Sequence, residues 1–164
     1  MHFDLDAMRA APGKLFRVAG DEHIPTLDWR GEEVQLEGPV HAEAAAFFEG
    51  ATNQVILTVH VRGKAHRRCS RCLADVVEEF DREEELEVYP EEAQGKYLEL
   101  RPFIESGARL GLSLKPLCKP DCRGLCPYCG ADLNREDHKP DCRRPRLPRD
   151  PRLSKLAELL EPQG

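Results

Sequence analysis

Seven cysteines are the residues of this 164-residue chain best suited to chemistry. Six of them fall into three close pairs and one stands alone: Cys69 and Cys72, Cys118 and Cys122, Cys126 and Cys129, then Cys142. Two thiolates separated by two or three residues can hold one metal ion from a tight turn, and each pair then supplies half of a tetrahedral zinc shell. Three such pairs predict structural metal sites rather than isolated core cysteines.

Two complete four-ligand sites need eight ligands, one more than the cysteines supply. His138, four residues before Cys142, is the candidate for the eighth ligand. Our preferred partition has two zinc ions: site 1 comprises Cys69, Cys72, Cys118 and Cys122, and site 2 comprises Cys126, Cys129, His138 and Cys142. A rival partition places Cys118, Cys122, Cys126 and Cys129 on a single zinc ion and leaves the other cysteines free.

The residues around these cysteines carry further expectations. Gly130 follows the second cysteine of a Cys-Pro-Tyr-Cys turn, where a zinc-binding turn commonly needs a positive φ that glycine adopts easily. A solvated surface position is the alternative to ligation for His138. We predict strand or surface positions, not ligation, for His60 and His66.

The predicted zinc sites are structural. A catalytic zinc keeps an open coordination position, which a shell closed by thiolates does not offer. The sequence also lacks the His-x-Glu element of zinc deaminases, a glycine-rich phosphate loop and a serine nucleophile motif. We therefore predict that the protein is not an enzyme and has no small-molecule substrate.

Basic residues gather in two places. The first basic cluster occupies ten positions that contain no acid, and the second follows the last cysteine: Arg62, Lys64, Arg67, Arg68 and Arg71, then Arg143, Arg144, Arg146, Arg149 and Arg152. Guanidinium groups suit phosphate, so both clusters are candidate RNA contacts. The alternative for the first cluster is a solvated face that pairs with the acidic segment 75–105, which carries twelve acids and three bases.

Hydrophobic periodicity predicts the elements that position these residues. Alternating apolar residues predict a β-meander over 34–61, with 55–64 as its surest strand, and further extended segments at 76–89 and 97–100. Apolar residues at helical spacing predict a helix over 102–114 with one face at Phe103, Gly107, Leu110 and Leu114. Residues 1–33 predict irregular structure with short strands.

We expect an α+β protein with a mainly antiparallel β core, a zinc-bound cysteine-rich C-terminal module and a short terminal helix. The β-rich domain covers 1–114 and the zinc module 115–142, because composition changes abruptly near Lys115. Residues 143–164 form a basic linker and a leucine-faced helix. The absence of an export signal and of any 18-residue apolar run predicts a cytoplasmic protein without a membrane partner.

Three stretches resemble a known family. The residues are CSRCL at 69–73, CKPDCRGLCPYCGADLN at 118–134 and DPRL at 150–153. Their order is similar to that of the YceD family of large ribosomal RNA subunit accumulation proteins, from about residue 34 to the C-terminal end. Family members often carry a Cys-x-Cys after the Leu-Asn, where this chain has only Cys142, with His138 upstream.

The resemblance implies a non-enzymatic ribosome-biogenesis factor that supports accumulation or processing of 23S ribosomal RNA. Its partner would be ribosomal RNA or a ribosome-assembly protein. The alternative is a zinc-stabilised adaptor that binds another protein without RNA contact. The formal net charge of -6 means that any RNA contact depends on local basic patches.

Overall fold

The structure is a computed structural model that describes residues 1–92 and 95–142. The chain divides into two compact units, Met1–Cys122 and Arg123–Gly164. The first unit contains, in order, β1 (His2–Asp4), α1 (Leu5–Ala10), β2 (Phe16–Glu22), β3 (Thr26–Trp29), β4 (Glu32–Leu36), β5 (Val40–Glu49), β6 (Gln54–Arg68), β7 (Asp75–Val88), a 3-10 turn (Pro90–Glu92), β8 (Tyr97–Glu99) and α2 (Arg101–Gly111). The predicted linker and terminal helix of residues 143–164 lie outside the described residues.

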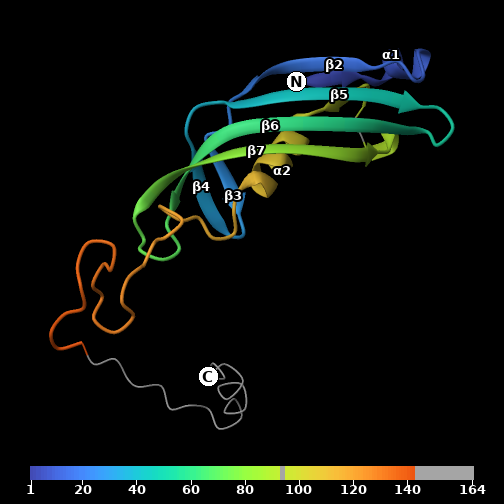
Figure 1. The fold of residues 1–164 in the computed structure, drawn as a ribbon. Coiled ribbons are helices and arrows are strands. Elements are labelled where there is room, and N and C mark those ends of the chain that lie inside the picture. The colour runs from blue at the N-terminus through green and yellow to red at the C-terminus, as the bar shows by residue number, and fades with distance from the viewer. Residues whose placement is uncertain (93–94, 143–164) are drawn as a thin grey trace, which may run out of the picture. The chain divides into compact units, whose positions relative to one another are not determined.

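The prediction of a mainly antiparallel β protein is confirmed. Six strands form one sheet in the order β2-β5-β6-β4-β3, with β7 also paired to β6, and every pair in it is antiparallel. The alternating burial along β5 follows directly from its sequence, in which alanine, valine and phenylalanine occupy every second position. Figure 1 shows β6 and β7 running side by side as the two long strands of the sheet.

The first basic cluster does not interrupt β6, which continues to Arg68, past the predicted end of the strand at residue 64. Along this part of β6, the small residues Gly63 and Ala65 and the buried Arg67 alternate with exposed basic residues. β7 pairs with β6 along its whole length, from Val55 opposite Val88 to Arg68 opposite Asp75. Cross-strand pairing therefore holds this polar segment extended.

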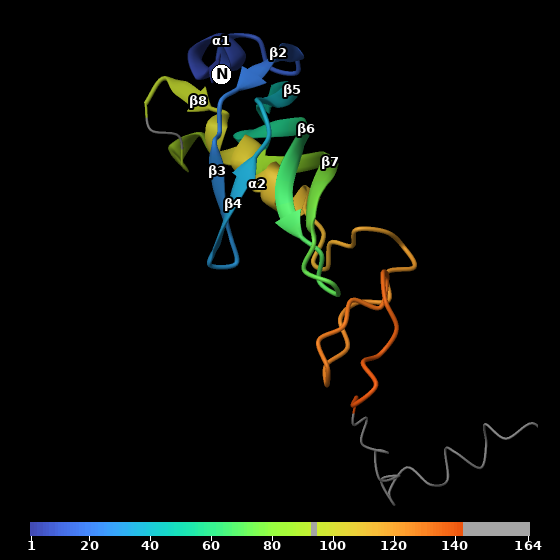
Figure 2. The ribbon, with the colours of Figure 1, turned by 90° about the vertical axis from the view of Figure 1, so that its left-hand side faces the viewer.

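Helix α2 packs on the inner face of the sheet (Figure 2) and is shorter than the predicted 102–114. The predicted apolar face is wrong at two positions, since Leu110 and Leu114 are 58% and 64% exposed. Gly107 of the predicted face is buried, together with Ile104 and Ala108. A Cβ on Gly107 would lie 2.9 Å from Cγ2 of Val61, so the glycine lets the helix backbone approach the sheet closely.

The N-terminal region is more regular than predicted. β2 is a seven-residue strand along β5, and the six-residue helix α1 was not predicted. The carboxylate of Asp4 caps α1 by accepting hydrogen bonds from the backbone N–H groups of Asp6 and Ala7, at 2.9 and 3.1 Å. A helix of fewer than two turns is too short to leave a periodic signal in the sequence.

Candidate metal centres

The first cysteine pair lies in the turn between β6 and β7. The backbone N–H of Cys69 donates to the carbonyl of Ala74 at 2.8 Å, and the N–H of Leu73 donates to the carbonyl of Cys69 at 2.9 Å. These two bonds close the turn around residues 69–72, so the thiols project from a rigid loop. We name residues 69–74 the first knuckle.

Residues 126–131, the second knuckle, have the same hydrogen bonds. The N–H of Cys126 donates to the carbonyl of Ala131 at 2.8 Å, and the N–H of Gly130 donates to the carbonyl of Cys126 at 2.9 Å. Gly130 has φ 71°, which confirms the predicted positive φ. Leu73 occupies the equivalent position of the first knuckle and has φ 61°, a conformation that L-residues with a Cβ rarely adopt.

The four cysteines of site 1 come together within the first unit. Their sulfur atoms all lie within 4.8 Å of one another, with Cys69 to Cys122 at 3.7 Å and Cys72 to Cys118 at 3.5 Å. Cys69 and Cys122 are almost fully buried, at 0% and 1% exposure. Residues far apart in sequence, at the β6–β7 turn and after α2, thus form one thiol cluster.

The sulfur spacing fits a tetrahedral metal ion. Four zinc–sulfur bonds of about 2.3 Å place neighbouring sulfurs about 3.8 Å apart. A disulfide would instead need about 2.05 Å. The cluster could therefore hold a metal ion, and sulfur-only ligation suits zinc or iron.

Site 2 lies wholly within the second unit. The sulfur of Cys142 is 3.7 Å from that of Cys126, and Nδ1 of His138 is 3.7 Å from Cys142 and 3.9 Å from Cys129. All four ligand atoms lie within 4.8 Å of one another. This group of three thiols and one imidazole could also hold a metal ion. That these eight residues are zinc ligands stays a prediction.

Backbone N–H groups, burial and neighbouring thiols shift the pKa values of the cysteines in each cluster in opposite directions. Backbone N–H groups, that of Cys72 first, lower the pKa of Cys69 to about 6, while the neighbouring thiol of Cys72 raises the pKa of Cys118 to about 12. In site 2, the N–H of Ala131 lowers the pKa of Cys129 to about 6, and burial raises that of Cys142 to about 12. A bound cation would favour the thiolate form of all of them.

Two polar side chains outside the ligand sets brace the clusters. Arg71 donates through Nη1 to the carbonyl of Cys122 at 2.7 Å, which ties the first knuckle to the second half of site 1. Oδ1 of Asn134 accepts from the N–H of Arg123 at 2.8 Å and holds the loop that precedes the second knuckle. Arg71 was predicted as an RNA contact, and the role of Asn134 left no signal in the sequence.

Zinc stoichiometry tests the place of His138. We expect two equivalents in the native protein and one in a His138→Ala variant, because three thiols alone leave site 2 open. His138→Cys should retain two. Total zinc in the purified protein, measured by mass spectrometry of the metal, gives the count. The exposed His66 provides the control, and equal zinc loss in His66→Ala would contradict ligation by His138 specifically.

The first basic cluster is largely paired with acids. Lys64 lies 2.8 Å from Glu79, Arg62 lies 2.5 Å from Glu43, and Arg68 lies 3.8 Å from Asp75. The hydrogen bond between Lys64 and Glu79 raises the pKa of the lysine and lowers that of the carboxyl group. The contacts of Lys64 and Arg68 are those expected from the alternative interpretation of the cluster as a face that pairs with the acidic segment 75–105, whereas Arg62 pairs with Glu43 of β5.

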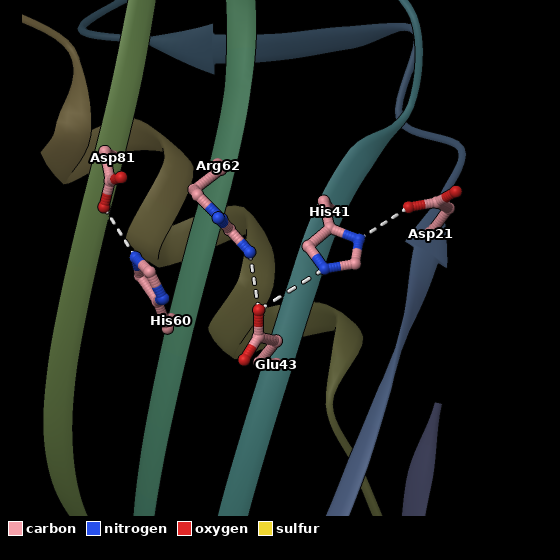
Figure 3. A network of polar contacts seen from close by, with 6 residues as sticks. All are labelled: Asp21, His41, Glu43, His60, Arg62 and Asp81. Carbon is pink, nitrogen blue, oxygen red and sulfur yellow. Dashed lines mark hydrogen bonds and ion pairs between the residues drawn. The ribbon is translucent and has the colours of Figure 1, made fainter.

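Figure 3 shows that such pairs continue across the exposed face of the sheet. His60 contacts Asp81 at 2.6 Å, and His41 lies between Asp21 at 2.9 Å and Glu43 at 3.5 Å. His60 is a strand residue, as predicted, and His66 is exposed on the same strand.

Arg67 is the buried exception in this cluster. Its side chain is 6% exposed, its guanidinium lies 4.2 Å from the ring centre of Trp29, and Nη1 is 3.5 Å from Glu78. Arg67 is thus enclosed by protein groups rather than presented to solvent. Arg143, Arg144 and Arg146 lie outside the described residues.

The chain is similar to one protein family and to several mycobacterial proteins. The sequence model of a family described as large ribosomal RNA subunit accumulation protein YceD matches residues 78–160. Uncharacterized proteins of Mycobacterium tuberculosis strain H37Rv and Mycobacterium bovis are each 28% identical over 178 residues, covering 100% of this chain and 83% of the relative. One from Mycobacterium leprae is 26% identical, covering 98% and 77%. No solved structure matches the chain significantly. Among residues 1–92 and 95–142, the structure contains no helix with the length and hydropathy of a transmembrane span.

Proposed function

Because the chain belongs to the YceD family of large ribosomal RNA subunit accumulation proteins, we propose that it is a non-enzymatic factor that supports 23S ribosomal RNA accumulation during large-subunit assembly. Its two thiol clusters are structural zinc sites in this proposal. They fix the β6–β7 turn to the segment after α2, and they shape the second unit. A role in assembly needs a surface that contacts RNA or protein rather than an active site.

The ion pairs between the first basic cluster and its acidic neighbours make the second basic cluster the better candidate for RNA contact. Lys64 and Arg62 already face carboxylates, and Arg67 is buried, so this cluster offers little free positive charge. The second cluster, at Arg143, Arg144 and Arg146, follows site 2 in a stretch with no acid between residues 142 and 149. We infer that the second cluster is the main phosphate contact.

Binding of a 23S ribosomal RNA fragment tests whether the second basic cluster is the main phosphate contact. Changing Arg143, Arg144 and Arg146 together to alanine should weaken binding at least tenfold at 0.1 M salt and reduce the slope of log K against log salt by about two, since each lost phosphate contact removes about 0.7 from it. Fluorescence anisotropy across a salt series measures both quantities.

The matched control changes three residues of the first cluster, Arg62, Lys64 and Arg68, to alanine. This variant carries the same change in net charge and should keep most of the affinity. Equal loss in both variants would mean that RNA senses only total charge. Salt-independent binding, or none, would favour the adaptor role in place of RNA contact.

A further inference from the structure

A groove of about 740 Å³ lies within the first unit, between the β3–β4 hairpin and the first knuckle. Trp29 and Val34 line it from the hairpin, Leu73 from the knuckle, and Leu114 and Pro116 from the segment after α2. Leu73 and Leu114 are 60% and 64% exposed, so two large apolar side chains stand free at its edge. An exposed apolar groove with polar rims is typical of a protein interaction site.

Leu73 is held there against its own backbone preference. At φ 61° its Cβ crowds the backbone, and glycine serves at the equivalent position of the second knuckle, where Gly130 has φ 71°. The two knuckles share the same hydrogen bonds, so the turn itself does not require a leucine. A strained residue whose side chain is exposed in a groove points to a role in binding.

The charges around the groove indicate what it binds. Its basic residues each have a carboxylate nearby: Arg67 has Glu78, Arg68 has Asp75, and His66 has Glu37 at 3.6 Å. Glu32 and Glu33, exposed on β4, have no ion pair among the described residues. The free charge at the rim is therefore negative, which disfavours a phosphate backbone and favours a cationic partner.

We propose that this groove is a docking site for a protein segment that presents leucine-like side chains flanked by lysine or arginine. Leu73 and Leu114 contact the apolar side chains of that segment, and Glu32 and Glu33 contact its cations. This goes beyond the proposed RNA contact, because it assigns a second surface, and a different class of partner, to the same protein. The two surfaces carry opposite charge.

A defined peptide tests the groove. The probe is a synthetic 18-residue amphipathic peptide of leucine and lysine, and its counterpart replaces every lysine by glutamate. Full-length protein should bind the lysine peptide, and Leu73→Gly should weaken binding about tenfold, as expected for loss of a central anchor. Glycine suits the positive φ, so the melting temperature of Leu73→Gly should equal or exceed that of the native protein. Glu32→Gln with Glu33→Gln should weaken binding several-fold.

Leu110→Ser is the matched control, because Leu110 is 58% exposed but does not line the groove. It should bind the lysine peptide as the native protein does. Equal binding by Leu73→Gly and the native protein, or equal binding of the lysine and glutamate peptides, overturns the proposal. Loss of RNA binding in Leu73→Gly with unchanged peptide binding would assign the groove to nucleic acid and overturn it as well.

Discussion

Chelation of zinc is expected to unfold residues 123–142 while the sheet of the first unit stays folded. Among the described residues of the second unit, the apolar core consists of Cys126 and Ala131, and the one β-bridge joins Leu125 to Asp132. So small a core cannot offset the conformational entropy of the chain. In such modules the free energy of metal binding is also the free energy of folding.

Hydrogen exchange measured residue by residue follows this unfolding. After treatment with a strong chelator under reducing conditions, the amides of Cys126, Gly130 and Leu133, each hydrogen-bonded to a backbone carbonyl, should lose all protection. Amides of β5 and β6 should retain theirs, because the core of the first unit is built from apolar side chains of its strands and helices. Continued protection of the three amides without metal would contradict a metal-dependent second unit.

Gly107→Val is expected to destabilise the first unit by about 2 to 3 kcal/mol, the range of overpacked cores. The new Cβ would meet Cγ2 of Val61 at 2.9 Å, and Val61 is fully buried, so neither side chain has room to move. The helix would have to shift away from the sheet. Thermal unfolding should show a melting temperature lower by about 6 to 12 °C.

Leu110→Val on the same helix is the control for this effect. It introduces the same β-branched residue at an exposed position and should cost less than about 0.5 kcal/mol, the propensity difference alone. The double variant Gly107→Val with Val61→Ala should recover part of the lost stability, because it removes the methyl groups in conflict. Equal melting temperatures for Gly107→Val and Leu110→Val would show that α2 does not need the close approach.

The sheet could be predicted because its signal is local. Alternating residues between Val40 and Val61 specify strands without knowledge of their partners, and the observed strands follow them. Residue type and spacing likewise predict the eight candidate metal ligands, and the structure brings them together in two groups of four. Tight turns make such spacing informative, since neighbouring ligands must come from one loop.

Features that depend on distant partners could not be predicted. The sequence gives no sign that Arg67 stacks on Trp29, thirty-eight positions earlier, because a cluster of arginines suggests solvent exposure. Gly107 and Gly111 lower the helical propensity of α2. The need for glycine at these positions follows only from the packing of the helix on the sheet, since a Cβ on Gly111 would lie 3.0 Å from Cβ of Phe80. Burial of Ile104 rather than Leu110 follows from the same packing.

Site 1 joins segments that are far apart in the chain, with Cys69 and Cys122 separated by 53 positions and Cys72 and Cys118 by 46. A metal ion bound there would act as a cross-link that closes a loop of roughly 50 residues, and by the chain-entropy relation for cross-links it would raise the free energy of the unfolded state by about 4 kcal/mol. Unlike a disulfide, this cross-link would be released by dilution of the ion. The stability of the β core would therefore rise with the logarithm of the free metal concentration, and the supply of metal in the cell would become a determinant of that stability.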